Sequence, residues 1–343
     1  GADHGAVGPR RRSCTCGFED LEEVGVLGWG SYAKVTLVKC ACRGAVYALK
    51  SISKGRVLQR RQVKQVQTER LVLKTVCSDF IVRLVRTYRT DTHVSFLMEP
   101  AMGGDLCTVV EKQQLYYSAR HARFYMACAA QGLEHLHERW IVNRDLKLEN
   151  MLLDSSGYCK LADFGLAKFV IGHTFTLCGT PDYMAPEVIT GKGHTRAVDW
   201  WALGVALYAL MAGIMPFDAP RPAQIFAKAK RGMEPVLAMT GFGGEPDDWT
   251  DVVQGLCKSD PSERLPARKG GAANLRQHRW FTKAKFDWRE LCDRTMRPPY
   301  FPDVRGKEDL SNFDPNPEDA PPDVMYFDPG DDWDADFDES ACR

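Results

Sequence analysis

The feature that most constrains the fold is the apolar run from Trp200 to Phe217. None of its 18 residues is charged, and that length approaches the roughly 17–25 residues of a membrane-spanning helix. Gly213 and Pro216 interrupt the run, however, and the acidic Asp199 stands directly at its head. A helix that is apolar all round can equally form the buried centre of a large domain. We therefore expect a core helix, in a chain that is long enough to bury it.

The charges of the chain balance, with 45 basic and 45 acidic residues. Such a balance does not indicate binding to nucleic acid or to a membrane surface. The first four residues include no initiator Met and no apolar signal core, so we expect the edge of a fragment and a cytoplasmic protein. Residues 1–17 are polar and rich in glycine, and we expect them to be flexible.

The cysteines are numerous but scattered along the sequence. Two pairs, Cys14 with Cys16 and Cys40 with Cys42, have C-x-C spacing. Neither pair has a histidine or a second pair close enough in the sequence to complete a zinc site. We therefore expect reduced thiols, which are usual in a cytosolic protein.

Charged and amide side chains crowd together in residues 143–150 and again at Asp163, which Phe-Gly follows. Phosphoryl transfer needs an acid that accepts or orients a proton, a cation and metal ligands, because the transferred group spreads negative charge over its oxygens. Asp145 suits the first role and Lys147 the second. Asn150 and Asp163 suit the third, since their oxygens are ligands that a hard cation prefers.

Residues 21–38 are predicted to form two strands joined by a turn that contains Gly28, Gly30 and Ser31. The backbone N–H groups of such a turn can lie over phosphates. A purely structural hairpin or a dinucleotide-binding fingerprint shares these glycines. A dinucleotide fold, however, expects a helix after the glycines and an acid for the ribose, whereas here a strand follows and the acid is missing.

The next predicted strand, residues 46–50, places Ala48 and Lys50 on one face. A lysine in a strand is most often a surface residue. Residues 63–76, however, have helical spacing, and Glu69 lies among their apolar positions. A carboxylate there is costly unless it is paired, so we expect Lys50 and Glu69 to form an ion pair.

Together these segments resemble the motifs of eukaryotic protein kinases: the glycine-rich loop, the lysine strand, the catalytic loop and the Asp-Phe-Gly segment. Ala185-Pro186-Glu187 matches the end of the activation segment. The Pro- and acid-rich tail, which ends in Trp333-Asp-Ala-Asp-Phe337, is similar to the tail of the AGC group of serine/threonine kinases. Residues 98–106 and 260–264 look most like the catalytic domain of cGMP-dependent protein kinases.

The resemblance implies an α+β, bilobal fold with a small, mainly antiparallel β lobe and a larger, mainly helical lobe. The implied parts are a flexible segment (1–17), a kinase domain (18–281) with small lobe (18–98), hinge (99–105) and large lobe (106–281), and an AGC-type tail (282–343). We expect the tail to wrap the domain, with Phe313 near the nucleotide and Trp333 and Phe337 inserted into the small lobe.

The resemblance also assigns residues to ATP, Mg²⁺ and catalysis. The implied nucleotide-binding residues are Leu27, Gly28, Gly30, Ser31, Val35, Ala48, Lys50, Met98, Glu99, Ala101, Asp105, Glu149, Leu152 and Phe313. The implied catalytic residues are Lys50, Glu69, Asp145, Lys147 and Thr180, and the implied metal ligands are Asn150 and Asp163. Thr176 stands where the family carries its activating phosphate, with Arg144 as the expected cationic partner. Glu187 is expected to pair with Arg264, and Asp199 to tie the buried helix to the catalytic loop.

The implied substrates are proteins with arginines before the phospho-acceptor. Asp105 and Glu149 correspond to acids that select those arginines, and Asp182 adds another. Where the family usually has a further acid, this chain has Ala209, so we expect weaker selection for the arginine two residues before the acceptor. The segment Arg10–Ser13 fits such a substrate and could be an autophosphorylation or pseudosubstrate site, or a solvated basic linker.

Several alternatives stay open. A catalytic subunit like that of cAMP-dependent kinases is the nearest, although residues 338–343 continue beyond its usual end. A catalytically silent, ATP-binding scaffold is another, because fold alone does not fix function. Asn143 replaces the usual His or Tyr of the catalytic loop, and Ala33 replaces a glycine. We expect any regulatory cyclic-nucleotide-binding region to be absent from this chain.

Overall fold

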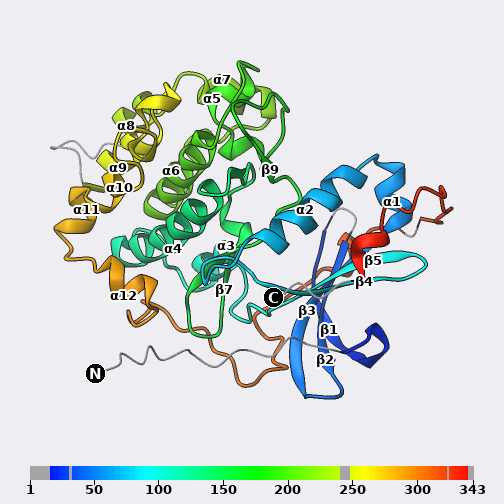
Figure 1. Cartoon of the computed structure of the whole chain (residues 1–343). Coiled ribbons are helices and arrows are strands. Elements are labelled where there is room, and N and C mark those ends of the chain that lie inside the picture. Colours follow the sequence, from blue (N-terminus) through cyan, green and yellow to red (C-terminus); the bar gives the residue numbers. More distant parts are fainter. Residues whose placement is uncertain (1–15, 31–32, 240–247, 323, 339–343) are drawn as a thin grey trace, which may run out of the picture. The chain divides into compact units, whose positions relative to one another are not determined.

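The structure is a computed structural model that describes residues 16–30, 33–239, 248–322 and 324–338, traced in Figure 1. Most of the segment predicted to be flexible, together with Arg10–Ser13, Cys14 and Ser31, lies outside the described residues. The chain divides into two compact units, which we describe separately. The sheet unit comprises Gly1–Val63, Leu84–Pro100 and Asp314–Arg343, and the helical unit comprises Lys64–Arg83 and Ala101–Phe313.

The sheet unit is built on five antiparallel strands. In spatial order these are β1 (Leu21–Trp29), β2 (Ala33–Cys40), β3 (Ala45–Ser53), β5 (His93–Met98) and β4 (Leu84–Arg89). Apolar side chains that alternate along these strands meet on one face. Val38, Leu49 and Leu97, from three different strands, belong to one buried cluster.

The tail contributes to the core of the sheet unit. Phe337 is 1% exposed and packs edge-to-face on Phe96 of β5, with ring centroids 5.6 Å apart. Trp333 is also buried, and Asp334 forms an ion pair with Lys54 in which both side chains are almost fully enclosed. The predicted insertion of Trp333 and Phe337 into the small lobe is therefore confirmed.

The helical unit surrounds α6 (Ala197–Ala212), whose residues from Ala197 to Met211 are all buried. The helix ends at Gly213, which has a left-handed φ of 70°. A Cβ at Gly204 would lie 3.0 Å from Cβ of Leu256, so the glycine allows α9 (Asp248–Leu256) to pack closely on α6. The prediction of a core helix is confirmed. Within the described part of the chain, no helix combines the length and apolarity that crossing a membrane requires.

Two of the remaining helices are long, at 13 and 19 residues, and the other elements are short. The other helices are α1 (Lys54–Gln59), α2 (Val63–Thr75), α3 (Leu106–Lys112), α4 (Ala119–His137), α5 (Pro186–Ile189), α7 (Pro222–Ala229), α8 (Glu234–Met239), α10 (Ala273–Arg276), α11 (Arg279–Thr282) and α12 (Trp288–Cys292). Two small antiparallel pairs join β6 (Ile141–Val142) to β9 (Lys168–Phe169) and β7 (Met151–Leu153) to β8 (Cys159–Leu161). Short 3-10 helices include η1 (Phe18–Asp20), η2 (Leu148–Asn150), η3 (Pro181–Tyr183), η4 (Pro261–Glu263), η5 (Leu265–Ala267), η6 (Pro317–Asp319) and η7 (Ala335–Phe337). The expected α+β class, a five-stranded antiparallel sheet followed by a mainly helical region, is thus confirmed.

The cysteines differ from expectation. Cys16 and Cys40, 24 residues apart, form a disulfide, so the expectation of reduced thiols is wrong for this pair. Cys42 lies beside both sulfurs of the disulfide, so three cysteines that are scattered in the sequence come together. The pairing of β1 with β2 places Leu21 opposite Cys40 and so brings the segment before η1 to the end of β2. No local spacing pattern could indicate this contact.

Candidate active site

The loop that carries Asp145 runs between β6 and β7 of the helical unit. Arg144 takes a left-handed φ of 68°, which turns the chain sharply. The backbone N–H groups of Asn143 and Arg144 both donate to the carboxylate of Asp199, at 2.9 Å each. Asp199 lies in the first turn of α6, is 1% exposed and also bonds Nε2 of His137 at 2.7 Å. The acid at the head of the apolar run therefore ties the loop to the core, as predicted.

Three polar side chains converge on the carboxylate of Asp145. Its Oδ1 accepts from the hydroxyl of Thr180 at 2.7 Å and from the Thr180 backbone N–H at 3.0 Å. Its Oδ2 accepts from the amide nitrogen of Asn150 at 3.2 Å and lies 3.5 Å from Nζ of Lys147. Nζ of Lys147 also donates to the hydroxyl of Thr180 at 3.2 Å. The carboxylate is thus held in one orientation by groups from two separate loops, while 12% of its side chain remains accessible.

Asn143 has a structural role that the sequence did not indicate. Its side-chain oxygen accepts from the backbone N–H of Asp145 at 3.0 Å, and the residue is 2% exposed. The polar side chain that replaces the usual His or Tyr is therefore hydrogen-bonded, and its oxygen satisfies a backbone donor of the loop. Phe164, the aromatic residue of the Asp-Phe-Gly segment, is buried at 1% exposure.

Asn150 and Asp163 present the oxygen ligands that a divalent cation needs. The amide nitrogen of Asn150 donates to both the backbone and the side chain of Asp145, which leaves the side-chain carbonyl oxygen as the atom that could bind a cation. Asp163 is exposed, has a left-handed φ of 57° and accepts from the backbone N–H of Gly165 at 3.3 Å. An all-oxygen donor set of this kind suits Mg²⁺.

The activation segment is anchored at its two ends and exposed between them. Arg144 donates through Nε to the carbonyl of Leu166 at 2.7 Å. Its Nη1 is buried and has no hydrogen-bond partner among the described residues. Lys168 bonds the hydroxyl of Thr174 at 3.0 Å, two residues before Thr176, which is exposed.

Two further features fix this segment. Gly179 has φ +108°, and a Cβ there would lie 2.6 Å from the carbonyl oxygen of Arg144, so only glycine allows the segment to approach the loop this closely. His194 forms two backbone hydrogen bonds with Thr174. Burial lowers the pKa of His194, and the charge of Arg144 adds to the effect.

The predicted pair of Glu187 and Arg264 is confirmed. Arg264 is fully buried and donates to both carboxylate oxygens of Glu187, at 2.6 and 2.8 Å. It also donates to the carbonyl of Ala197 at 2.8 Å, and its guanidinium lies over the ring of Trp201. The end of the activation segment is therefore locked to the start of α6 by a bidentate pair.

The predicted nucleotide-binding residues fall in both units. The sheet unit carries Leu27, Gly28, Gly30, Val35, Ala48, Lys50, Met98 and Glu99, and the helical unit carries Ala101, Asp105, Glu149, Leu152 and Phe313. Ser31 lies outside the described residues. Lys50 and Glu69 belong to different units; Glu69 is 1% exposed in α2, and its pairing with Lys50 stays a prediction.

Within the sheet unit, strand register aligns the phosphate-binding candidates. Gly28 of β1 pairs with Val35 of β2, and Val35 pairs in turn with Lys50 of β3. Ala48, two residues before Lys50 and on the same face, pairs with Met98 at the end of β5. The predicted hairpin and lysine strand are therefore adjacent and in register.

Within the helical unit, Asp105 and Leu152 form an isolated antiparallel bridge. Asp105 also caps α3 by accepting from the backbone N–H of Thr108 at 2.8 Å. Glu149 is exposed in η2. The side chain of Asn312, next to Phe313, donates to the carbonyl of Met102 at 3.0 Å, which fixes this part of the tail against the segment that leads to Asp105.

Comparison with known proteins agrees with this arrangement. A family model described as "Protein kinase domain" matches residues 21–281. The chain is 39% identical over 312 residues to "cGMP-dependent protein kinase egl-4" of Caenorhabditis briggsae, covering 89% of this chain and 41% of that protein. It is 38% identical over 325 residues to "cGMP-dependent protein kinase, isozyme 1" of Drosophila melanogaster, covering 93% and 41%.

A cAMP-dependent relative is nearly as similar. The "cAMP-dependent protein kinase catalytic subunit" of Dictyostelium discoideum is 37% identical over 316 residues, covering 91% of this chain and 48% of that protein. The chain thus spans less than half the length of these relatives. A protein kinase domain implies ATP with a divalent metal ion. The chain belongs to the protein kinase family, as a serine/threonine kinase domain homologous to the AGC group.

Proposed function

We propose that the chain transfers the γ-phosphate of ATP to serine or threonine in arginine-rich protein substrates, and that it is the catalytic part of a cGMP-dependent protein kinase. The observation that carries the proposal is the hydrogen-bonded group around Asp145, in which Thr180, Lys147 and Asn150 all contact one carboxylate. A silent scaffold would need no such constraint on a partly exposed acid.

In the proposed reaction, Asp145 accepts or orients the proton of the substrate hydroxyl. Thr180 holds the carboxylate through Oδ1, so Oδ2 is the oxygen better placed for that proton. Lys147, which contacts both Asp145 and Thr180, stabilises negative charge on the transferring group. Magnesium, held by Asn150 and Asp163, would neutralise charge on the β- and γ-phosphates when ATP is bound.

The nucleotide is proposed to bind through both units. The N–H groups of the Gly28–Gly30 turn cover the phosphates, Lys50 reaches the α- and β-phosphates, and Glu69 holds that lysine. Backbone groups of Glu99 and Ala101 bind adenine, and Asp105 faces the ribose. Apolar contact to the base comes from the remaining members of the set, which are Leu27, Val35, Ala48, Met98, Leu152 and Phe313. Glu149 is placed on the side of the protein substrate.

Activation is proposed to require phosphate on Thr176. The exposed hydroxyl of Thr176 is available to another kinase, and the unpartnered Nη1 of Arg144 is a buried donor that a phosphate would satisfy. Because Arg144 adjoins Asp145, such a bond would couple the phosphate to the catalytic loop.

Substrate selection is proposed to rest on acids that the family uses for arginine. Glu149 is exposed and Asp182 is partly exposed, and both lie near the ends of the catalytic loop and activation segment. Leu177, 59% exposed, offers apolar surface for the residue after the acceptor. Ala209 lies buried in α6 and provides no charge, which supports weaker selection for the arginine two residues before the acceptor.

Control by cGMP rests on similarity to the relatives named above, and control by cAMP is the second candidate because the Dictyostelium relative is almost as similar. Either nucleotide would act through a regulatory region outside this chain. A cytoplasmic location also stays part of the proposal. Activation of the natural full-length protein by cGMP at concentrations where cAMP is inactive would decide between the two.

The deciding experiment is transfer of phosphate from Mg-ATP to an arginine-rich serine peptide, with Asp145→Asn as the matched control. Loss of the catalytic carboxylate is expected to lower kcat by about 10²- to 10⁴-fold, with ATP binding retained. Equal activity in the variant would refute the assignment of Asp145. Absence of transfer by wild-type protein that binds ATP and carries phosphate on Thr176 would favour the scaffold.

A further inference from the structure

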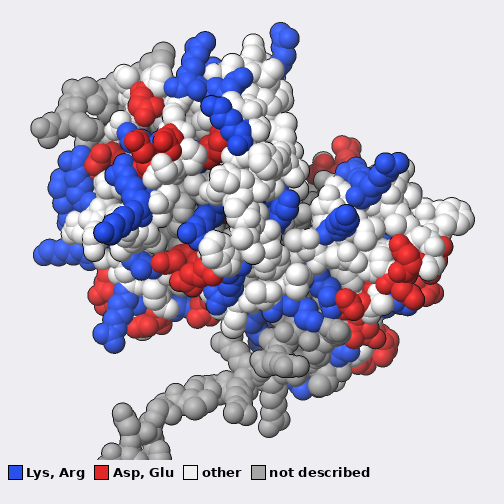
Figure 2. All heavy atoms as spheres, turned by 45° about the horizontal axis from the view of Figure 1, so that its top comes forward, with Lys and Arg blue, Asp and Glu red and all other residues white. Residues whose placement is uncertain are grey.

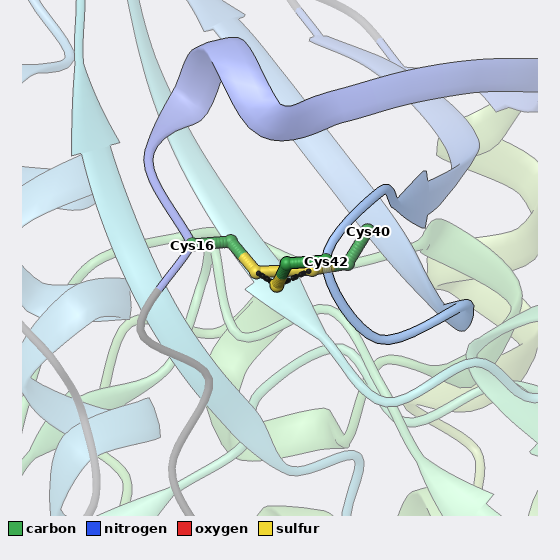
Figure 3. A group of neighbouring side chains, drawn as sticks. All are labelled: Cys16, Cys40 and Cys42. Carbon is green, nitrogen blue, oxygen red and sulfur yellow. Dashed lines mark hydrogen bonds between the residues drawn. A yellow bond between two sulfur atoms is a disulfide. The ribbon is translucent and has the colours of Figure 1, made fainter.

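Three cysteine sulfurs gather at one corner of the sheet unit. The Sγ atoms of Cys16, Cys40 and Cys42 all lie within 4.8 Å of one another. Figure 3 shows them pointing at a common place, Cys16 from the segment before η1, Cys40 from the end of β2 and Cys42 from the turn that follows. None of these residues belongs to the kinase site described above.

The backbone around the three sulfurs is fixed from several sides. The carbonyl of Cys16 accepts from the hydroxyl of Tyr88 at 3.0 Å, in the buried cluster of the sheet unit. The carbonyl of Cys40 accepts from the N–H groups of Arg43 and Gly44, which closes a tight turn with Gly44 at φ 60°. The turn therefore places Cys40 and Cys42 on one side although only one residue separates them.

The disulfide explains two of the three sulfurs and not the third. Cys42 Sγ lies 2.7 Å from Cys16 Sγ and 3.0 Å from Cys40 Sγ. A disulfide between Cys16 and Cys40 does not explain why the exposed Cys42 places its sulfur against both of them. A cation bound by all three sulfurs would explain it.

We propose that Cys16, Cys40 and Cys42 form a Zn²⁺ site when they are reduced. Thiolate sulfur is a ligand that zinc favours, with Zn–S near 2.3 Å and tetrahedral geometry. The three sulfurs would fill three of the four positions, and solvent would take the fourth. That geometry puts neighbouring sulfurs about 3.8 Å apart. The two contacts of Cys42 must therefore open by roughly 1 Å, which its exposed side chain can allow. The sulfurs of Cys16 and Cys40 must separate further, which reduction of their bond permits. The site would fasten the segment before β1 to the turn between β2 and β3.

Zinc binding and the disulfide use the same sulfurs, so they are alternative states. Reduction by a dithiol transfers two electrons and two protons to Cys16 and Cys40, and the dithiol itself becomes a disulfide. The three thiols then lose their protons to solvent as Zn²⁺ binds, because thiolate is the ligating form. After chelation of the metal, exchange with a small-molecule disulfide, which takes up the two electrons and two protons and becomes two thiols, returns the chain to the disulfide state.

Cobalt(II), as a spectroscopic substitute for zinc, tests the site on the whole reduced chain. One Co²⁺ per chain is expected, with the intense near-ultraviolet absorption of thiolate-to-cobalt charge transfer, and Zn²⁺ is expected to abolish it by displacement. The variant Cys42→Ser changes only an exposed side chain. It is expected to weaken Co²⁺ binding by at least about 10- to 100-fold, because even the loss of a residue that only supports a metal ligand costs that much. Cys77→Ser, at an exposed free cysteine, serves as the control and is expected to bind as the wild type does.

Two outcomes would overturn the proposal. The first is the absence of a thiolate–cobalt band in reduced wild-type protein, which would leave thiol–disulfide chemistry as the only role of the cluster. The second is an unchanged band in Cys42→Ser, which would place the metal elsewhere. Both readouts are independent of kinase activity.

Discussion

Asp145 uses its two carboxylate oxygens differently. Oδ1 accepts two hydrogen bonds from Thr180, whereas Oδ2 faces Asn150 and Lys147. The bonds to Oδ1 fix the rotation of the carboxylate, and a fixed rotation is what positions the other oxygen for a substrate hydroxyl. The hydroxyl of Thr180 is central to this arrangement, because it donates to Asp145 and accepts from Lys147.

Substitution of Thr180 tests that positioning. Thr180→Ala removes both side-chain hydrogen bonds and leaves only the backbone bond to Oδ1, so we expect kcat to fall about 10- to 100-fold, equivalent to ~1.4–2.7 kcal/mol of barrier. KM for ATP should stay unchanged. Thr180→Ser keeps the hydroxyl and should recover most of the rate in steady-state peptide phosphorylation. A serine variant as slow as the alanine variant would show that the methyl group, rather than the hydroxyl, matters.

The Asp145 group was predictable because its residues are close together in the sequence. The contacts that were not predicted leave no such local pattern. Asp145, Lys147 and Asn150 lie within one short loop, so their types and order indicated the chemistry directly. The hydrogen bond that the N–H of Asp145 donates to the side-chain oxygen of Asn143 leaves no pattern in a sequence, because many polar side chains can accept from a backbone N–H. The Cys16–Cys40 disulfide joins residues 24 apart, and the pairing of β1 with β2 brings them together.

At the scale of elements, α6 serves both the core and the site. Its first turn supplies Asp199, which accepts from two backbone N–H groups of the catalytic loop. Its middle is buried against α9, where Gly204 allows close approach. The apolar run predicted the burial, and the resemblance to protein kinases implied the tie of Asp199 to the loop. The contact with α9 was not predictable, because nothing in the run says which helix covers it.

The close packing of α6 on α9 can be tested at Gly204. A Cβ there would overlap Sγ of Cys257 and come within 3.0 Å of Cβ of Leu256. Overpacking typically costs about 1–3 kcal/mol, while alanine gains about 1 kcal/mol of helix propensity. We therefore expect Gly204→Ala to lower the free energy of unfolding by about 1 kcal/mol in urea titrations.

The variant Cys257→Ala supplies the partner for a double-mutant cycle. Removal of the sulfur makes room for the new Cβ, so Gly204→Ala should cost about 0.5–3 kcal/mol less in the Cys257→Ala background. Equal costs in both backgrounds would mean that Leu256 or the backbone, rather than the sulfur, limits the space.

At the scale of the whole molecule, segments far apart in the sequence complete one unit. The strands of residues 21–53 and 84–98 share their core with the end of the tail, through Phe337 on Phe96 and Asp334 with Lys54. Ion pairs contribute to this assembly as well, because Arg89 of β4 lies 3.5 Å from Asp334 and Arg86 lies 3.7 Å from Asp338. Figure 2 shows basic and acidic side chains interspersed over one face, in keeping with the balanced composition. Aromatic residues at intervals in an otherwise polar tail indicated the docking, because such residues are costly to leave in water.

Phe337→Ala tests whether the tail is part of the sheet unit's stability. Phe337 is 1% exposed, whereas Phe327, in the same tail, is 75% exposed, so Phe327→Ala is a control of matched chemistry. Truncation of a buried Phe typically costs about 3–5 kcal/mol, and an exposed substitution usually stays within about 0.5 kcal/mol. Hydrogen exchange should show lost protection in β5, where Phe96 lies, for Phe337→Ala alone. Comparable exchange rates in β5 for the two variants would show that the sheet is stable without the tail. Phe337 would then cover the sheet without stabilising it.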